Sequence, residues 1–114
     1  MNCLETNEDE KFIKYALKYL EEIPDKDRRP GKYTDWFLYH AVGLKLHEQG
    51  KQEKALEYYQ KAISKESHAE TFSFIGQAHK DLGNEKQAIS YWRTAAKMGY
   101  GQAIMALNSR GIDI

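Results

Sequence analysis

Four histidines are the side chains of this 114-residue sequence that most readily suggest metal or acid–base chemistry: His40, His47, His68 and His79. His40 and His47 are seven residues apart in one expected helix, which separates them by two turns, or about 10 Å along the axis. One ion cannot bind both without a third element between them, and neither His-x3-His spacing nor a Cys–His cluster occurs. The sequence therefore predicts no metal site and no cofactor.

Motifs for catalysis are also missing from the sequence. Gly50 and Gly83 each follow an expected helix, so we interpret them as helix-terminating residues and not as parts of a phosphate-binding loop. There is no nucleophile elbow, and no arrangement of serine, histidine and aspartate along the chain supports a catalytic triad. The sequence therefore predicts that the protein is not an enzyme.

Composition narrows the expected partners and location. The 17 basic and 17 acidic residues cancel, and nucleic-acid binding normally needs a basic face, so nucleic acid is not an expected partner. No apolar run reaches the ~20 residues that span a bilayer, and the acidic residues 1–10 lack the apolar core of a secretory signal. The single Cys3 cannot form an internal disulfide and fits a reducing compartment. These features predict a soluble cytoplasmic protein.

Apolar residues follow helical spacing almost throughout, which predicts an all-α fold. The first helix is expected at residues 7–23 and ends before Pro24, which cannot continue a helix. Residues 25–32 are expected to form a charged loop. Five further helices are expected from 34 or 35 to about 49, at 52–65, from 67 to about 82, from 84 to about 98, and at 101–109.

Capping residues mark the ends of these expected helices. Thr34 or Asp35 would cap the second helix, and Asn84 the fifth. Ser67 and Glu70 have the Ser-x-x-Glu spacing of a capping box, which predicts that the fourth helix starts there. Three glycines would end helices in the left-handed conformation: Gly50, Gly83 and Gly99.

One pattern of small and aromatic residues occurs twice at a spacing of 33 residues. The first copy has Gly43, Gly50, Ala55, Tyr59 and Ala62, and the second has Gly76, Gly83, Ala88, Trp92 and Ala95. Small residues suit places where two antiparallel helices approach closely, and the aromatic residue suits the space left by the next unit. The pattern therefore predicts helix pairs that bury their apolar faces by stacking.

This pattern resembles the tetratricopeptide repeat over about residues 35–107. The period is 33 where the family's usual period is 34, and Ser67 stands where a proline normally closes the unit. From Ala95 to Leu107 the chain is more similar to Sel-like repeats. The resemblance implies an all-α superhelix in a single domain, 1–114, with repeats at 35–67 and 68–100, an N-terminal helix at 7–23 and a C-terminal capping helix at 101–109.

The N-terminal helix has two interpretations. Residues 16–23 align with residues 55–62, so the first helix would be the second helix of a degenerate repeat whose first helix is missing. Any amphipathic helix rich in leucine and tyrosine would align equally well. Both interpretations stay open at the level of sequence.

The resemblance also implies a binding surface, because it places the first helix of each unit on a concave face. Side chains not needed for packing would then line a groove for a peptide or helix of another protein. The expected groove residues are Phe37, His40, Leu44, His47, Ser73, Gln77 and Lys80, and Glu70 falls at a similar position. The alternative is that the first helix covers these residues. The lysine–asparagine clamp of one subset of the family is absent, since its positions hold His40, Leu44 and Phe74.

Two functions are compatible with this architecture. The first is an adaptor that binds a segment of a partner protein in the groove. The second is a structural subunit without a ligand groove, whose repeat ends pair between copies as a homo-oligomer or within a larger complex.

Overall fold

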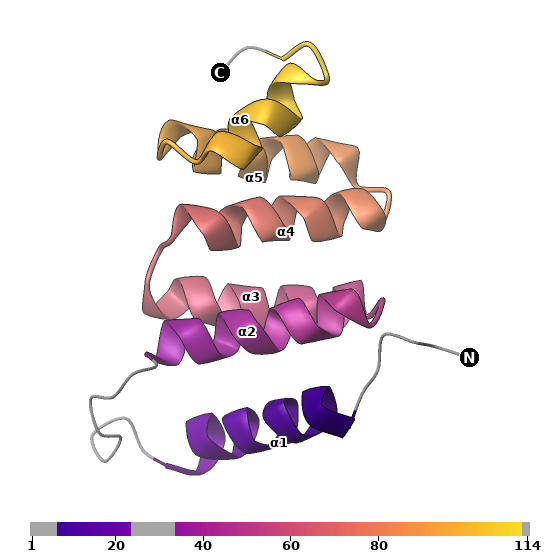
Figure 1. Cartoon of the computed structure of the whole chain (residues 1–114). Helices are drawn as coiled ribbons and strands as arrows, with labels where there is room; N and C mark the ends of the chain where they lie inside the picture. Colours follow the sequence, from indigo (N-terminus) through magenta and orange to yellow (C-terminus); the bar gives the residue numbers. More distant parts are fainter. Residues whose placement is uncertain (1–6, 24–33, 113–114) are drawn as a thin grey trace.

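The computed structural model describes residues 7–23 and 34–112, and all regular secondary structure within them is helical. The described residues form six helices: α1 (Asn7–Glu22), α2 (Asp35–Glu48), α3 (Gln52–Lys65), α4 (Ala69–Asp81), α5 (Glu85–Lys97) and α6 (Gly101–Asn108). They stack in chain order from α1 at one end to α6 at the other (Figure 1). The predicted all-α superhelix is confirmed, whereas Cys3 and the expected loop at 25–32 lie outside the described residues.

The helices associate in pairs. α2 packs against α3 and α4 against α5, and the α3–α4 and α5–α6 contacts join successive units. α1 packs against α2 as α3 packs against α4, so it occupies the place of a second helix that precedes a first helix (Figure 1). The degenerate-repeat interpretation requires this arrangement and remains a prediction.

Glycines opposite aromatic rings allow each pair to close. A Cβ atom at Gly43 would lie 2.6 Å from the ring of Tyr59, and one at Gly76 would lie 2.7 Å from Nε1 of Trp92. The close helix contacts expected at these glycines are therefore present. Each ring thus fills the space left by the glycine of its own unit. Tyr59 also stacks on Phe74 of the next unit, with ring centroids 6.2 Å apart.

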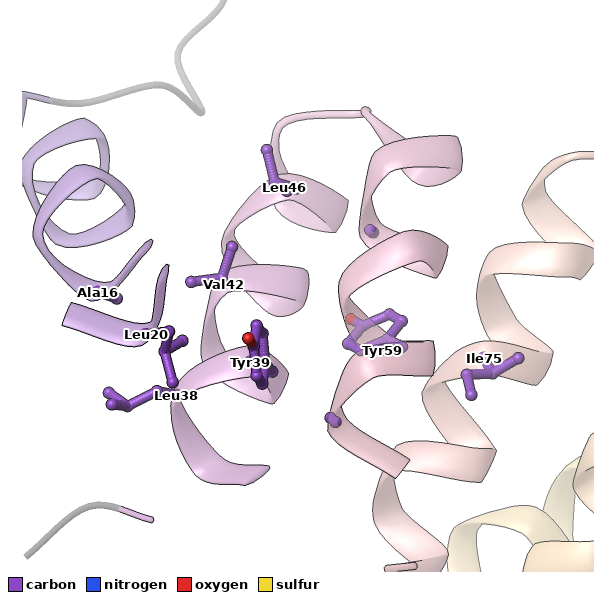
Figure 2. Close-up of a cluster of buried hydrophobic side chains, with 10 residues drawn as sticks. Ala16, Leu20, Leu38, Tyr39, Val42, Leu46, Tyr59 and Ile75 are labelled. Atoms are coloured by element: carbon purple, nitrogen blue, oxygen red, sulfur yellow. The ribbon is translucent and has the colours of Figure 1, made fainter. Parts of the chain in front are cut away.

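The apolar interior consists of two clusters. The first joins α1, α2, α3 and part of α4, and Figure 2 shows Ala16 and Leu20 beside Leu38, with Tyr59 and Ile75 on the following helices. The second cluster joins α5 and α6, and residues from the start of α4 pack against it. α4 therefore contributes to both clusters and holds the two ends of the stack together.

Helix ends follow the predictions in part. The Thr34 hydroxyl accepts a hydrogen bond from the backbone N–H of Phe37 at 3.2 Å, so the predicted cap of α2 is confirmed. The predicted helix-terminating glycines all have positive φ: Gly50 (81°), Gly83 (85°) and Gly99 (89°). None of the helices is long and apolar enough to cross a membrane, a finding that covers the described residues.

The predicted capping box of α4 is wrong, and the predicted cap of α5 is correct in position but not in its hydrogen bond. α4 begins at Ala69 with His68 as its N-cap, and no side chain caps it, because Ser67 lies one residue too early to reach the first turn. Asn84 does precede α5, but its side chain makes no capping hydrogen bond. Its amide nitrogen lies instead 3.4 Å from Nδ1 of His79.

Candidate functional site

Polar side chains hold the first helices of the two repeats, α2 and α4, beside one another. Near one end, Nε1 of Trp36 donates a hydrogen bond to Oγ1 of Thr71 at 2.8 Å, and Thr71 lies 3.0 Å from Nδ1 of His40. Near the other end, Nε2 of His47 lies 2.9 Å from a carboxylate oxygen of Asp81. These contacts fix the relative position of the two helices, so their outer residues form one continuous face.

His40 belongs to the interior of this arrangement, because only 3% of it is exposed. Its ring stacks on Trp36 with centroids 5.2 Å apart and meets Phe74 edge-on at 5.5 Å. The indole N–H can only donate, so it uses an acceptor site on the Thr71 hydroxyl. The hydroxyl proton remains available to Nδ1 of His40, 3.0 Å away, when that nitrogen is unprotonated.

The surroundings of His40 oppose a positive charge. Burial, with a smaller contribution from the charge of His68, lowers the pKa of His40 to about 4. His40 is therefore neutral near pH 7, which is compatible with a hydrogen bond accepted by Nδ1.

His47 connects three helices. Its Nδ1 lies 3.3 Å from the Tyr59 hydroxyl on α3, and its Nε2 contacts Asp81 on α4. Burial tends to raise the pKa of Asp81, but hydrogen bonds donated by His47 and Gln77 outweigh it, so the pKa is lowered. An ionised Asp81 only accepts, so Nε2 of His47 donates to it, while Nδ1 forms the contact with the Tyr59 hydroxyl.

The predicted groove residues differ in their accessibility. Lys80 is exposed and Phe37 is 36% exposed, whereas the half-buried residues are Leu44, His47, Ser73 and Gln77. Leu44 also packs against the first apolar cluster. The side chain of His40 does not line an accessible groove, because Trp36, Tyr59, Thr71 and Phe74 surround it. His40 instead supports the face from beneath.

The α2–α4 face lies apart from two hollows that described residues line. Hollows of about 330 and 380 Å³ occur elsewhere, one at the α2–α3 turn and one along α5, and neither includes a predicted groove residue. Within the part of the chain that the structure describes, no three His, Cys, Asp or Glu residues converge to hold a metal ion. The geometry suits contact with a chain segment more than enclosure of a small ligand.

Sequence reasoning missed Thr71 and Asp81, the two α4 residues that join α2. Thr71 is fully buried and aligns, at the 33-residue period, with the core residue Leu38. A hydroxyl at a core position needs a hydrogen-bond partner, and that signal was present in the repeat alignment. Asp81 carried no comparable signal, since it lies at the exposed end of α4.

A model of the tetratricopeptide repeat matches residues 38–64 and 69–98, which together make up half of the chain. The two matched segments correspond to the α2–α3 and α4–α5 pairs. Searches of curated proteins and of solved structures returned no match.

Proposed function

This chain belongs to the tetratricopeptide-repeat family, whose repeats generally mediate protein–protein interaction, and on that premise we propose that it is an adaptor without enzymatic activity. It binds a peptide or helix of a partner protein on the face formed by α2 and α4. The partner is expected to meet this face in the cytoplasm.

The exposed ring of Phe37 carries this proposal. Phe37 is 36% exposed and lies beside Trp36, with ring centroids 6.2 Å apart. Trp36 is itself held by its hydrogen bond to Thr71 on the neighbouring first helix. An aromatic anchor on a rigid support suits a binding hot spot, because little conformational freedom is lost on association.

The other accessible residues of the face define the partner's general chemistry. Leu44 adds apolar surface, whereas Ser73 and Lys80 add a hydroxyl and a positive charge. Gln77 is oriented by a hydrogen bond to Asp81 at 3.1 Å. A segment with an apolar side chain for Phe37 and polar groups on either side matches this distribution.

The test is affinity capture from the native cell extract with wild type, Phe37→Ala and Tyr15→Ala as baits. Tyr15 is the matched control, since it is an exposed aromatic residue on α1 (62% exposed). We expect one partner with wild type and Tyr15→Ala, and its loss with Phe37→Ala at an unchanged melting temperature. Equal recovery by all three folded baits would contradict the assignment. Leu44→Glu is a poorer probe, because it also disturbs the core.

Self-association is the second candidate function. Tyr15 supports it, because an aromatic side chain exposed to this extent at the end of a helix stack is a natural contact between copies. A sedimentation mass that rises with concentration, and stays monomeric in Tyr15→Glu, would favour a structural subunit. A constant monomer mass for wild type would exclude it.

A further inference from the structure

α6 continues the binding face beyond α4. Each of these helices has two fully buried residues four positions apart: Thr71 and Ile75 in α4, and Ala103 and Leu107 in α6. Ser73 and Met105 each lie two positions after the first residue of their pair, so both point to the same side of the stack. The register between the helices is 32 residues, because α5 is one residue shorter than α3 while the turns before α4 and α6 are equally long.

Met105 is an unusual residue at such a position. It is 70% exposed, more than any other large apolar side chain among the described residues. The flexible, polarisable thioether adapts to irregular apolar surfaces and makes favourable contacts with aromatic rings. Met105 therefore gives α6 a group suited to a partner's apolar side chain.

Glu70 adds a negative charge on α4, close to the start of α6. Its carboxylate is half exposed, and its closest described basic group is Nε2 of His40 at 3.9 Å, which is neutral near pH 7. No lysine or arginine in residues 7–23 and 34–112 pairs with it. The charge of Glu70, after the larger effect of burial, helps raise the pKa of Tyr100 at the start of α6. The carboxylate thus lies near the start of α6, and no lysine or arginine of the described residues offsets its charge.

We infer that the face between α4 and α6 binds a partner segment in which a lysine or arginine stands next to an apolar side chain. The basic group pairs with Glu70, and the apolar group contacts Met105 across the small side chain of Ser73. A polyanion would be repelled by Glu70, which favours a protein segment over nucleic acid. The inference rests on the proposed function and names the chemistry of its partner.

The experiment selects random peptides displayed on phage against the wild-type protein. We expect the selected peptides to share a basic residue next to an apolar one. Their synthetic copies should bind Glu70→Lys and Met105→Glu about tenfold more weakly than wild type, since charge reversal turns an attraction into a repulsion. Met98→Glu and Glu53→Lys are the matched controls, because both residues are exposed away from this face, and both should bind as wild type does.

A charge exchange makes the test specific. A selected peptide whose basic residue is replaced by glutamate should bind Glu70→Lys better than wild type. No selected peptide, a selection without basic residues, or equal binding to wild type and Glu70→Lys would overturn the inference. Loss of peptide binding in Phe37→Ala alone would leave the proposed function standing without this inference, and no effect in any of the three variants would count against both.

Discussion

Hydrogen bonding and burial both favour a neutral His40 between α2 and α4. The indole of Trp36 donates to the Thr71 hydroxyl, whose proton can in turn be donated to an unprotonated Nδ1 of His40. A second proton on His40 would place a positive charge in the interior. The neutral imidazole therefore suits both its burial and its contact with Thr71.

Acid should destabilise the fold through His40. Its pKa is about 4 in the folded state against 6.5 ordinarily, so the unfolded state binds more protons between these values. Above pH 6.5 His40 should not affect the free energy of unfolding. As the pH drops to 4, the free energy of unfolding should fall by up to about 3 kcal/mol. Urea unfolding of wild type and His40→Gln at several pH values measures this. The same pH dependence in the variant would contradict it.

At the scale of the helix, α1 repeats the contacts of a second helix. Gln60 on α3 donates to the Tyr91 hydroxyl on α5 at 3.3 Å. The residues at the aligned positions are Glu21 and Tyr58, and Glu21 lies close enough to contribute, after burial, to the raised pKa of Tyr58. The equivalent contact supports the degenerate-repeat interpretation of α1.

The pairing of α2 with α3 should be sensitive to a single methyl group. Gly43→Ala should lower the free energy of unfolding by about 1–3 kcal/mol, because the new Cβ would overlap the buried ring of Tyr59. Gly101→Ala is the control, since a Cβ there meets nothing within 4 Å. Thermal or urea unfolding gives both values. An unchanged midpoint for Gly43→Ala would mean that the helices do not approach as closely as described.

The two helix starts predicted from capping residues should differ in energy. Thr34→Ala should cost about 1 kcal/mol, because the hydroxyl satisfies a free N–H group of α2. Ser67→Ala should be nearly neutral, because no side chain caps α4. Urea unfolding measures both values. Equal losses of stability in the two variants would support the predicted capping box at Ser67 and contradict the helix start described for α4.

At the scale of the whole molecule, α4 is the element that both apolar clusters share. Ile75 is a buried member of the first cluster, while Phe72 on the same helix packs against the second. The stack should therefore unfold as one unit, although repeat proteins interact mainly between neighbours.

A core deletion in α4 tests this coupling. Ile75→Ala should cost about 2–5 kcal/mol, since Ile75 is fully buried. Hydrogen exchange should show the loss equally in the amides of α3 and of α5, and Tyr15→Ala on the exposed side of α1 should leave both unchanged. Faster exchange in α3 alone would show that the two repeats unfold independently.

Residue patterns predicted the helices, the two repeats and the close contact of Gly43 with its partner helix. The groove assignment itself stays a prediction. Phe37 and Lys80 are exposed, whereas His40 is buried, because side chains from α3 and α4, which follow later in the chain, cover it together with Trp36. The pattern within one helix predicts which way a side chain points. It does not predict which residues of other helices cover that side chain.

The sequence by itself thus determined the fold, since helix periodicity, terminating glycines and the 33-residue spacing are local properties of the chain. The tertiary structure decided which polar residues meet. His40 and Thr71 are 31 positions apart in the sequence. The Thr71 hydroxyl lies 3.0 Å from Nδ1 of His40 only because α2 and α4 are stacked. The tertiary structure also decided that Met105 matches Ser73 at a register of 32 residues and not 33, because α5 is one residue shorter than α3.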